Sequence, residues 1–171
     1  MTDPSDPAAE FAGFIGQPTS AGVVTVERAT VSAFAASVLD ANPVHRNRNA
    51  AQAAGFDDIP APPTYFFSAA PNWNHWEEEQ PPDPTGGANP MAEVMGGLMA
   101  RGGLILHGEQ AFTYHRPAVV GEKLHESGVV KDIYSKQSGE RTMTFMVIET
   151  TFSDDEGNPV VTSTMNLIHR A

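Results

Sequence analysis

The second half of the chain is built from β-prone segments, and this feature most constrains the fold. Four such runs, separated by breaks that contain Pro, Gly or Asp, cover residues 104–115, 123–134, 142–152 and 160–170. The third run is apolar on both of its alternating faces, as expected for a central strand that is covered on both sides. Because short connections favour neighbouring strands, we expect these runs to form one antiparallel sheet.

The first half carries helical patterns. Apolar residues recur at helical spacing between Val31 and Leu39, and Thr30 is available as an N-cap. Residues 50–54 could add a helical turn, and an apolar stretch at 65–70 follows Pro63, which suits the start of a helix. A helix-bearing half followed by an antiparallel meander predicts an α+β fold, in which one curved antiparallel sheet wraps around a central helix.

The length of 171 residues predicts a single domain with a substantial core. We expect residues 1–10 to form a flexible acidic tail and residues 11–171 to form the domain. Within it, residues 71–103 are rich in Pro, Gly and Asn, which is typical of a long irregular insertion. This insertion could be a lid over a substrate or a surface excursion packed on the domain. A short helix could start at Asn89 and Pro90 and would be weakened by the two glycines at 96–97.

Composition excludes several kinds of function. The chain has no cysteine, which rules out disulfides, a thiolate nucleophile and cysteine metal ligands. Its formal net charge of −11 opposes non-specific binding to nucleic acid. No apolar run reaches membrane-spanning length, and the N-terminus lacks the regions of a signal peptide. We therefore expect a cytoplasmic protein without a nucleic-acid or membrane partner.

Residues 40–45 read Asp-Ala-Asn-Pro-Val-His and carry the strongest chemical signal. Asn favours turns through its side chain, and Pro fixes its own φ and keeps the preceding residue extended. Such a turn can direct Asp40 and His45 at one small molecule such as water, as proton-transfer catalysis requires. Asn42 would brace the turn. An ordinary helix C-terminal turn with an exposed histidine would give the same spacing.

Two other groups of residues could bind ligands. His107, Glu109 and His115 share strand parity, but the two histidines would lie roughly 26 Å apart along an extended strand. We therefore expect no metal site. Arg46, Arg48 and Arg101 could contact the phosphate groups of a phosphopantetheine or nucleotide, because the guanidinium group matches phosphate geometry. Ordinary surface charge explains these arginines equally well.

Several motifs together resemble those of a known family. They read LDANPVH at 39–45, APPT at 61–64, LHGEQ at 106–110, YHRP at 114–117 and NLIHR at 166–170. The chain is similar to MaoC-type hot-dog proteins, and more narrowly to the N-terminal domain of MaoC-like dehydratases, from about residue 11 to 170. Two positions depart from that pattern. The family often has Gly where this chain has Leu39, and often has Asp where this chain has Asn47.

The resemblance implies a single hot-dog domain that reversibly hydrates trans-2-enoyl thioesters to (R)-3-hydroxyacyl thioesters. Asp40 and His45 correspond to the family's catalytic pair. Negative charge on the thioester oxygen would need N–H donors, and the helix beginning near Pro63 offers those of Thr64 and Tyr65. No cofactor is expected, because the substrate itself carries coenzyme A or a phosphopantetheine of a carrier protein.

The family also implies a partner, because hot-dog units pair. We expect a homodimer or a heterodimer with a second hot-dog chain. Some relatives lack the Asp-His pair and only hold the acyl chain for a catalytic partner, so a non-catalytic subunit is the alternative function. A hot-dog thioesterase would usually carry a carboxylate on its central helix, and residues 65–70 contain none.

Overall fold

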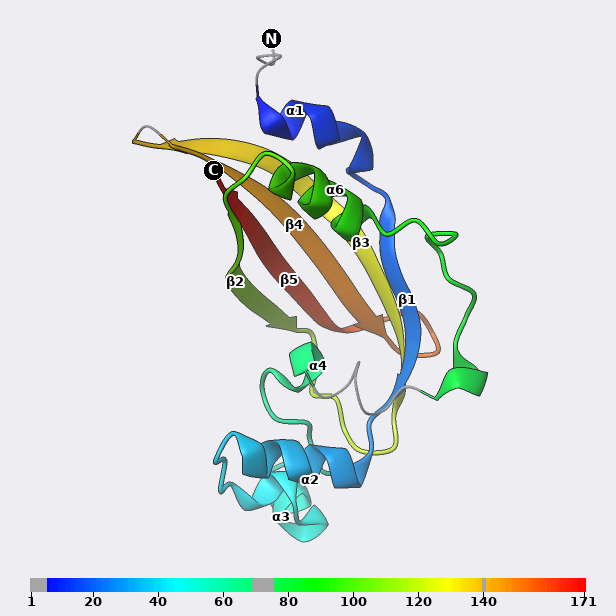
Figure 1. Cartoon of the computed structure of the whole chain (residues 1–171). Coiled ribbons are helices and arrows are strands. Elements are labelled where there is room, and N and C mark those ends of the chain that lie inside the picture. The colour runs from blue at the N-terminus through cyan, green and yellow to red at the C-terminus, as the bar shows by residue number, and fades with distance from the viewer. Residues whose placement is uncertain (1–5, 69–75, 140) are drawn as a thin grey trace.

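The computed structural model describes residues 6–68, 76–139 and 141–171. Five antiparallel strands form one curved sheet in the order β1-β3-β4-β5-β2 (Figure 1). The strands are β1 (Pro18–Thr25), β2 (Leu104–Tyr114), β3 (Lys123–Ser138), β4 (Arg141–Ser153) and β5 (Pro159–Arg170). All four β-prone runs of the second half are therefore strands, and the run that is apolar on both faces is the central one.

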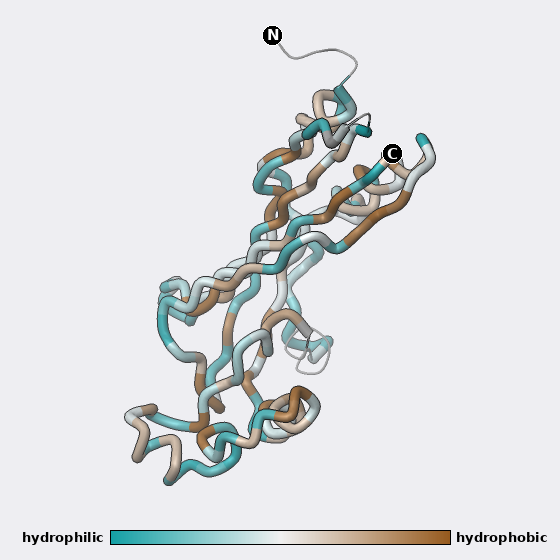
Figure 2. The backbone as a smooth tube through the Cα atoms, turned by 90° about the vertical axis from the view of Figure 1, so that its left-hand side faces the viewer, coloured by the Kyte–Doolittle hydropathy of each residue, from teal (hydrophilic) through white to brown (hydrophobic). Residues whose placement is uncertain are grey.

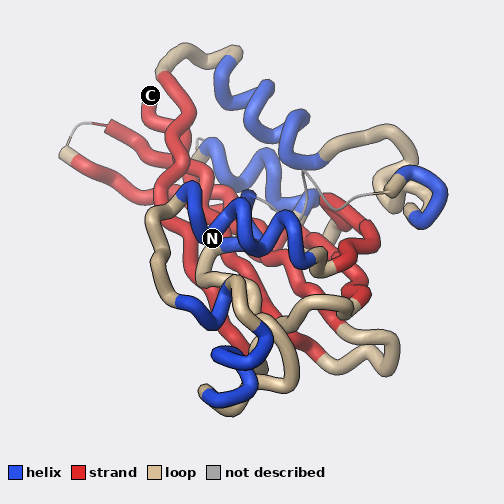
Figure 3. Tube along the Cα trace, turned by 90° about the horizontal axis from the view of Figure 1, so that it is seen from below, coloured by secondary structure: helices blue, strands red, loops and turns tan. Residues whose placement is uncertain are grey.

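Short helices connect and cover the strands. They are α1 (Pro7–Phe11), η1 (Ala12–Phe14), α2 (Arg28–Ser37), η2 (Pro43–His45), α3 (Arg48–Ala53), α4 (Tyr65–Ser68), η3 (Glu77–Glu79) and α6 (Pro90–Met99). Helix α6 crosses the sheet near its upper end, whereas α2 and α3 lie below it (Figure 1). Seen from below, α2 and α3 lie in front of the strands (Figure 3). The predicted α+β fold with a curved antiparallel sheet is confirmed.

Two hydrophobic clusters stabilise the fold. In the lower one, Tyr65 and Phe66 of α4 pack with residues of α2, of α3 and of four strands, among them Phe34 and Phe152. In the upper one, Val94 and Leu98 of α6 pack with residues of α1, β3 and β4. Hydrophobic and hydrophilic residues alternate along the strands (Figure 2). Because successive side chains of a strand point to opposite faces, the hydrophobic ones lie on the face of the sheet that packs in these clusters.

The N-terminal segment differs from the expected flexible tail. Residues 7–10 belong to α1, where Asp6 accepts a hydrogen bond from the Ala8 N–H at 3.0 Å and Pro7 occupies the first turn. Ala8 and Phe11 are buried in the upper cluster. Capping and burial together order this segment. Residues 1–5 lie outside the described part of the chain.

The segment expected to be an irregular insertion, residues 71–103, contains a helix. Helix α6 occupies 90–99, with the Asn89 side chain accepting the Ala92 N–H, as its Asn-Pro start predicts. Val94 and Leu98 are fully buried, so α6 is part of the core. Residues 71–75 lie outside the described residues, and whether the segment acts as a lid stays a prediction.

Two local expectations are wrong. Glu27, not Thr30, is the N-cap of α2, and the Thr30 hydroxyl instead donates to the Glu27 carbonyl at 3.0 Å. In β2 a bulge between His107 and Glu109 breaks the strand parity. His107 therefore keeps the face that contacts Phe67, whereas Glu109 lies on the other face and bonds Asn166.

No helix in the described residues is long and apolar enough to span a bilayer.

Candidate active site

The turn after α2 holds Asp40 and His45 in a fixed relation. Helix α2 ends at Ser37 with Val38 as its C-cap, and Leu39 takes a left-handed conformation with φ of 59° that redirects the chain. The Asn42 side chain then accepts the Val44 N–H at 3.2 Å and caps η2, which carries His45. Glycine is favoured at left-handed positions, which explains why the family often has Gly at the position of Leu39.

The two side chains meet directly. Asp40 Oδ2 lies 3.4 Å from His45 Nε2. Asp40 Oδ1 accepts the Asn42 N–H at 2.8 Å, which fixes the carboxylate in the turn. The His45 side chain is 9% exposed and that of Asp40 is 31% exposed, so the pair can be reached mainly from the side of Asp40.

The tautomer of His45 follows from its second contact. Nδ1 lies 2.8 Å from the carbonyl oxygen of Pro60, which can only accept a hydrogen bond. Nδ1 therefore carries the proton, and Nε2 of the neutral ring presents a lone pair beside the Asp40 carboxylate. A water molecule could donate one hydrogen to each of these two acceptors. The arrangement is suited to removing a proton from water.

A cavity of about 600 Å³ opens beside His45. Its walls come from three segments that the sequence analysis singled out: the turn, the APPT motif and the YHRP motif. The lining residues include Asn42, His45, Ala61, Pro63, Tyr114, His115 and Arg116. The fold thus brings three motifs that are far apart in the sequence together beside His45, in a mostly apolar space of the size that binds small molecules.

Tyr114 also lines this cavity, and no role for it was predicted from the sequence. Its hydroxyl accepts the Thr64 N–H at 3.0 Å. Tyr65 N–H donates to the Pro62 carbonyl at 3.2 Å. Both N–H groups expected to serve a thioester oxygen therefore have protein partners, which corrects that expectation. Because the Tyr114 oxygen acts as acceptor here, its own proton is free to point elsewhere. The YHRP motif was the signal that could have identified it.

The three candidate arginines have different surroundings. Arg46 donates to the Asp40 carbonyl at 2.7 Å and so braces the turn. Arg48 pairs with Asp58 at 2.9 Å and keeps an exposed side chain. Arg101 pairs with Glu10 beyond the end of α6. The eleven residues of β2 separate it from Tyr114 by about 35 Å, so Arg101 is not part of this site.

Ion pairs hold the segments around the cavity. The hydrogen bond from Arg48 and the N–H of Ile59 keep the pKa of Asp58 below its usual value. Arg116 bonds Glu122 at 2.6 Å and Asp154 at 3.4 Å. Burial alone would lower the pKa of Arg116, but these two carboxylates outweigh it and raise the pKa. Asn47, the second departure from the family pattern, accepts the Ala50 N–H and caps α3.

No three His, Asp or Glu side chains of the described residues lie close enough to hold a metal ion.

The sequence matches the family described as FAS1-like, dehydratase domain region, over residues 13–163. The chain belongs to this family of dehydratase domains. It is also 30% identical to a UPF0336 protein of Saccharopolyspora erythraea, over 92% of this chain and 89% of that protein. A UPF0336 protein of Parafrankia sp. is 31% identical, over 92% of each chain.

Solved structures of low sequence identity share the fold of this dehydratase domain. A chain of the ChsH1-ChsH2 complex from Mycobacterium tuberculosis superposes with a TM-score of 0.70 at 20% identity, over 95% of this chain and 88% of that one. A chain of the HadBC (3R-hydroxyacyl-ACP dehydratase) complex from the same organism gives 0.64 at 18% identity, over 91% and 96%. A MaoC-like dehydratase gives 0.65 at 22% identity, over 93% of this chain and 43% of that one. The predicted resemblance to the MaoC-like hot-dog family is confirmed.

Proposed function

We propose that this protein catalyses the reversible addition of water to trans-2-enoyl thioesters, giving (R)-3-hydroxyacyl thioesters, with Asp40 and His45 as the catalytic pair. The observation that carries the proposal is the approach of Asp40 Oδ2 to His45 Nε2, 3.4 Å apart beside a mostly apolar cavity. The family of dehydratase domains is consistent with this chemistry.

The pair would hold and deprotonate the attacking water. As the water oxygen bonds to C3, one proton passes to the pair and the electrons of the C2–C3 double bond move toward the thioester carbonyl. The pair then returns a proton to C2, so that H and OH have been added across the double bond. The Pro60 carbonyl keeps the imidazole oriented throughout, since it holds the proton on Nδ1.

Tyr114 is our candidate for stabilising the thioester oxygen. It lines the cavity that also contains His45, and its oxygen already accepts the Thr64 N–H. That bond orients the phenol and leaves the hydroxyl proton for a ligand oxygen. A fixed donor directed at developing negative charge is among the most effective contributions that an active site makes.

The substrate would carry coenzyme A or phosphopantetheine, so no separate cofactor is needed. Arg48 is exposed and lies three residues after His45, which makes it our candidate contact for a phosphate group. Its bond to Asp58 orients the guanidinium. Arg46, bonded to the Asp40 carbonyl, would act on the geometry of the turn instead.

We also infer that a second hot-dog chain completes the protein. Strand β2 is an edge of the sheet, pairing only with β5 among the described strands. It exposes Leu104, Leu106 and Tyr114. Long exposed edge strands with apolar side chains are prone to pair with another chain. Two of the structures of similar fold are chains of the ChsH1-ChsH2 and HadBC complexes. The molar mass in solution, alone and with a candidate partner, tests this inference.

The alternative is a non-catalytic subunit that binds the acyl group for a partner. The two-chain complexes of similar fold are compatible with such a division of roles between two chains. The presence of both Asp40 and His45 at contact distance favours catalysis.

The deciding experiment is hydration of crotonyl-CoA and of a longer enoyl-CoA by the purified chain, followed by the loss of enoyl absorbance. Asp40→Asn and His45→Gln should each lower the rate by about two to four orders of magnitude. His125→Gln serves as control, because that histidine pairs with Asp155 outside the cavity lining. Activity that survives both site substitutions would refute the assignment. Inactivity of the wild type with every candidate partner would favour the binding subunit.

A further inference from the structure

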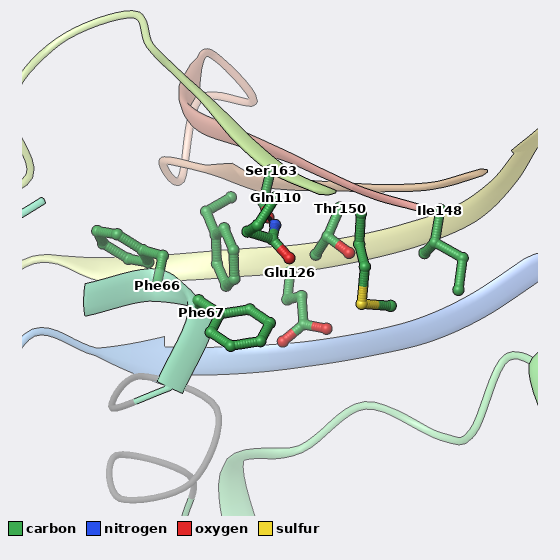
Figure 4. Close-up of a pocket in the computed structure, with 9 residues that line it drawn as sticks. Phe66, Phe67, Gln110, Glu126, Ile148, Thr150 and Ser163 are labelled. Carbon is green, nitrogen blue, oxygen red and sulfur yellow. Dashed lines mark hydrogen bonds between the residues drawn. The ribbon is translucent and has the colours of Figure 1, made fainter. Parts of the chain in front are cut away.

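The described helices cover one face of the sheet and leave the other open. Ile148 and Thr150 of β4 line a cavity against helix α4, so their side chains point to the helix-covered face (Figure 4). Successive side chains of a strand point to opposite faces. Phe145 and Val147 of the same strand therefore lie on the opposite face of the sheet, which we call the outer face.

A row of apolar side chains, one from each of four strands, crosses the outer face. Each is the direct cross-strand partner of the next, in the order Tyr134 on β3, Phe145 on β4, Ile168 on β5 and Leu106 on β2. Tyr134 and Phe145 stack with their ring centroids 4.8 Å apart. None of the four residues belongs to either hydrophobic cluster, and Leu106 is 42% exposed. A contiguous apolar row on an open face indicates a surface that another molecule covers.

Charges of opposite sign flank this apolar row. On the side nearer the end of β5, the next row contains Lys136 and Arg170. On the other side, the next row contains Asp132 and Glu109. None of these four residues forms an ion pair within the described part of the chain, and Lys136 Nζ instead lies 5.1 Å from the centre of the Tyr134 ring. Charges of both signs on the outer face are therefore available to another molecule.

This pattern is complementary to itself. A two-fold rotation about a line along the apolar row lays the outer face of a second copy on the first and puts each basic row opposite the other copy's acidic row. Lys136 then faces Asp132 of the partner subunit, and Met143 faces Val147 of the partner subunit. Two sheets that pack face to face lie about 10 Å apart, which suits such a layer of side chains. The acidic residues disfavour an anionic partner such as a lipid surface, and the net charge of −11 does so as well.

We propose that two copies of this chain associate through their outer faces, with the apolar rows in contact and Lys136 opposite Asp132 of the partner subunit. This contact is separate from the β2 edge considered above, because β4 and β5 lie between β3 and β2 in the sheet. Association through the outer face therefore leaves that edge free for a second hot-dog chain. It also leaves Asp40 and His45 uncovered, because both residues lie outside the strands of the sheet.

The molar mass in solution tests this proposal, measured by sedimentation equilibrium over a range of protein concentrations. Lys136→Glu and Asp132→Lys each set like charges opposite one another across the two-fold axis. Each should raise the dissociation constant by at least about tenfold and halve the mass at concentrations where the wild type is associated. The double variant carries both reversals, so opposite charges face each other again and its mass should return to that of the wild type.

A mixture of the two single variants separates this effect from misfolding. A Lys136→Glu chain and an Asp132→Lys chain match each other at both positions, so an equimolar mixture should associate as the wild type does. Lys123→Glu, the same change at the other end of β3, where the lysine pairs with Glu79, should leave the mass unchanged. These measurements use no substrate, so they do not depend on the proposed function.

Two results would overturn the proposal. One is a mass that is the same in the wild type and in both single variants at every concentration, which would leave the outer face to a partner of another kind. The other is a loss of association that neither the double variant nor the mixture restores, because Lys136 and Asp132 would then not face each other.

Discussion

The Tyr114 hydroxyl accepts the N–H of Thr64 at 3.0 Å and so joins the end of β2 to the residue that precedes α4. Thr64 has a φ of 66°, which is a genuine outlier for a β-branched residue. Residues held in such conformations tend to occur at functional sites. Tyr114 lines the cavity beside His45, and Thr64 directly follows Pro63 of its wall, in line with the role proposed for Tyr114 in binding the thioester oxygen.

Replacing Tyr114 by Phe tests that role. The substitution removes one hydroxyl and keeps the ring, which stacks on Phe112. We expect kcat for crotonyl-CoA hydration to fall by about 100-fold, as on loss of an oxyanion donor, with a smaller change in KM. Steady-state kinetics measure both. Unchanged kcat would assign Tyr114 a purely structural role.

Leu39 should be replaceable by Gly with a gain in stability. Its side chain is 90% exposed and its φ is 59°, so the side chain contributes strain without burial. Relief of the left-handed strain should exceed the entropy cost of glycine and raise the free energy of unfolding by about 0.5 to 1 kcal/mol. Urea denaturation gives the value. Leu39→Ala keeps the β-carbon and should change little.

The two glycines of α6 should respond oppositely to alanine. A β-carbon at Gly96 meets no atom within 4 Å, and alanine there should stabilise the helix by about 1 kcal/mol. A β-carbon at Gly97 would lie 2.7 Å from the ring of Phe11, which is itself buried against α6. Gly97→Ala should therefore lower the thermal midpoint while Gly96→Ala raises it. A higher thermal midpoint in both variants would show that Phe11 of α1 does not pack closely against α6.

Acid should remove the contribution of Asp58. Its pKa lies below the ordinary 3.8, first because of the Arg48 hydrogen bond and then because of the Ile59 N–H. A carboxyl with a lowered folded-state pKa stabilises the protein above its unfolded pKa, and that stabilisation disappears as the pH falls through the folded value. Asp58→Asn should be less stable than wild type at neutral pH and lose less stability below pH 3.8. The free energy of unfolding of both proteins, measured from neutral to acid pH, provides the comparison. If it falls equally in wild type and Asp58→Asn, the prediction is wrong.

The sequence alone determined the local elements of this protein. Runs of β-prone residues between Pro, Gly and Asp breaks located β2 to β5, and an apolar helical spacing located α2. The Asn-Pro pairs located the turn that contains η2 and the start of α6. The motif at 40–45 also predicted that the side chains of Asp40 and His45 point to one place, and the structure holds them 3.4 Å apart. These features depend on neighbours within a few residues, and short-range propensities record them.

Only the tertiary structure decided which distant residues meet. The bulge at Gly108 inserts one extra residue into β2 and so reverses which of the following residues face the core. Glycine is required there because a β-carbon would clash with Ile168 on the neighbouring strand. A hydrogen bond joins Tyr114 to Thr64, 50 residues away in the sequence, whereas the length of β2 removes Arg101 from the site. Register and bulges depend on contacts between strands, which no local period in the sequence encodes.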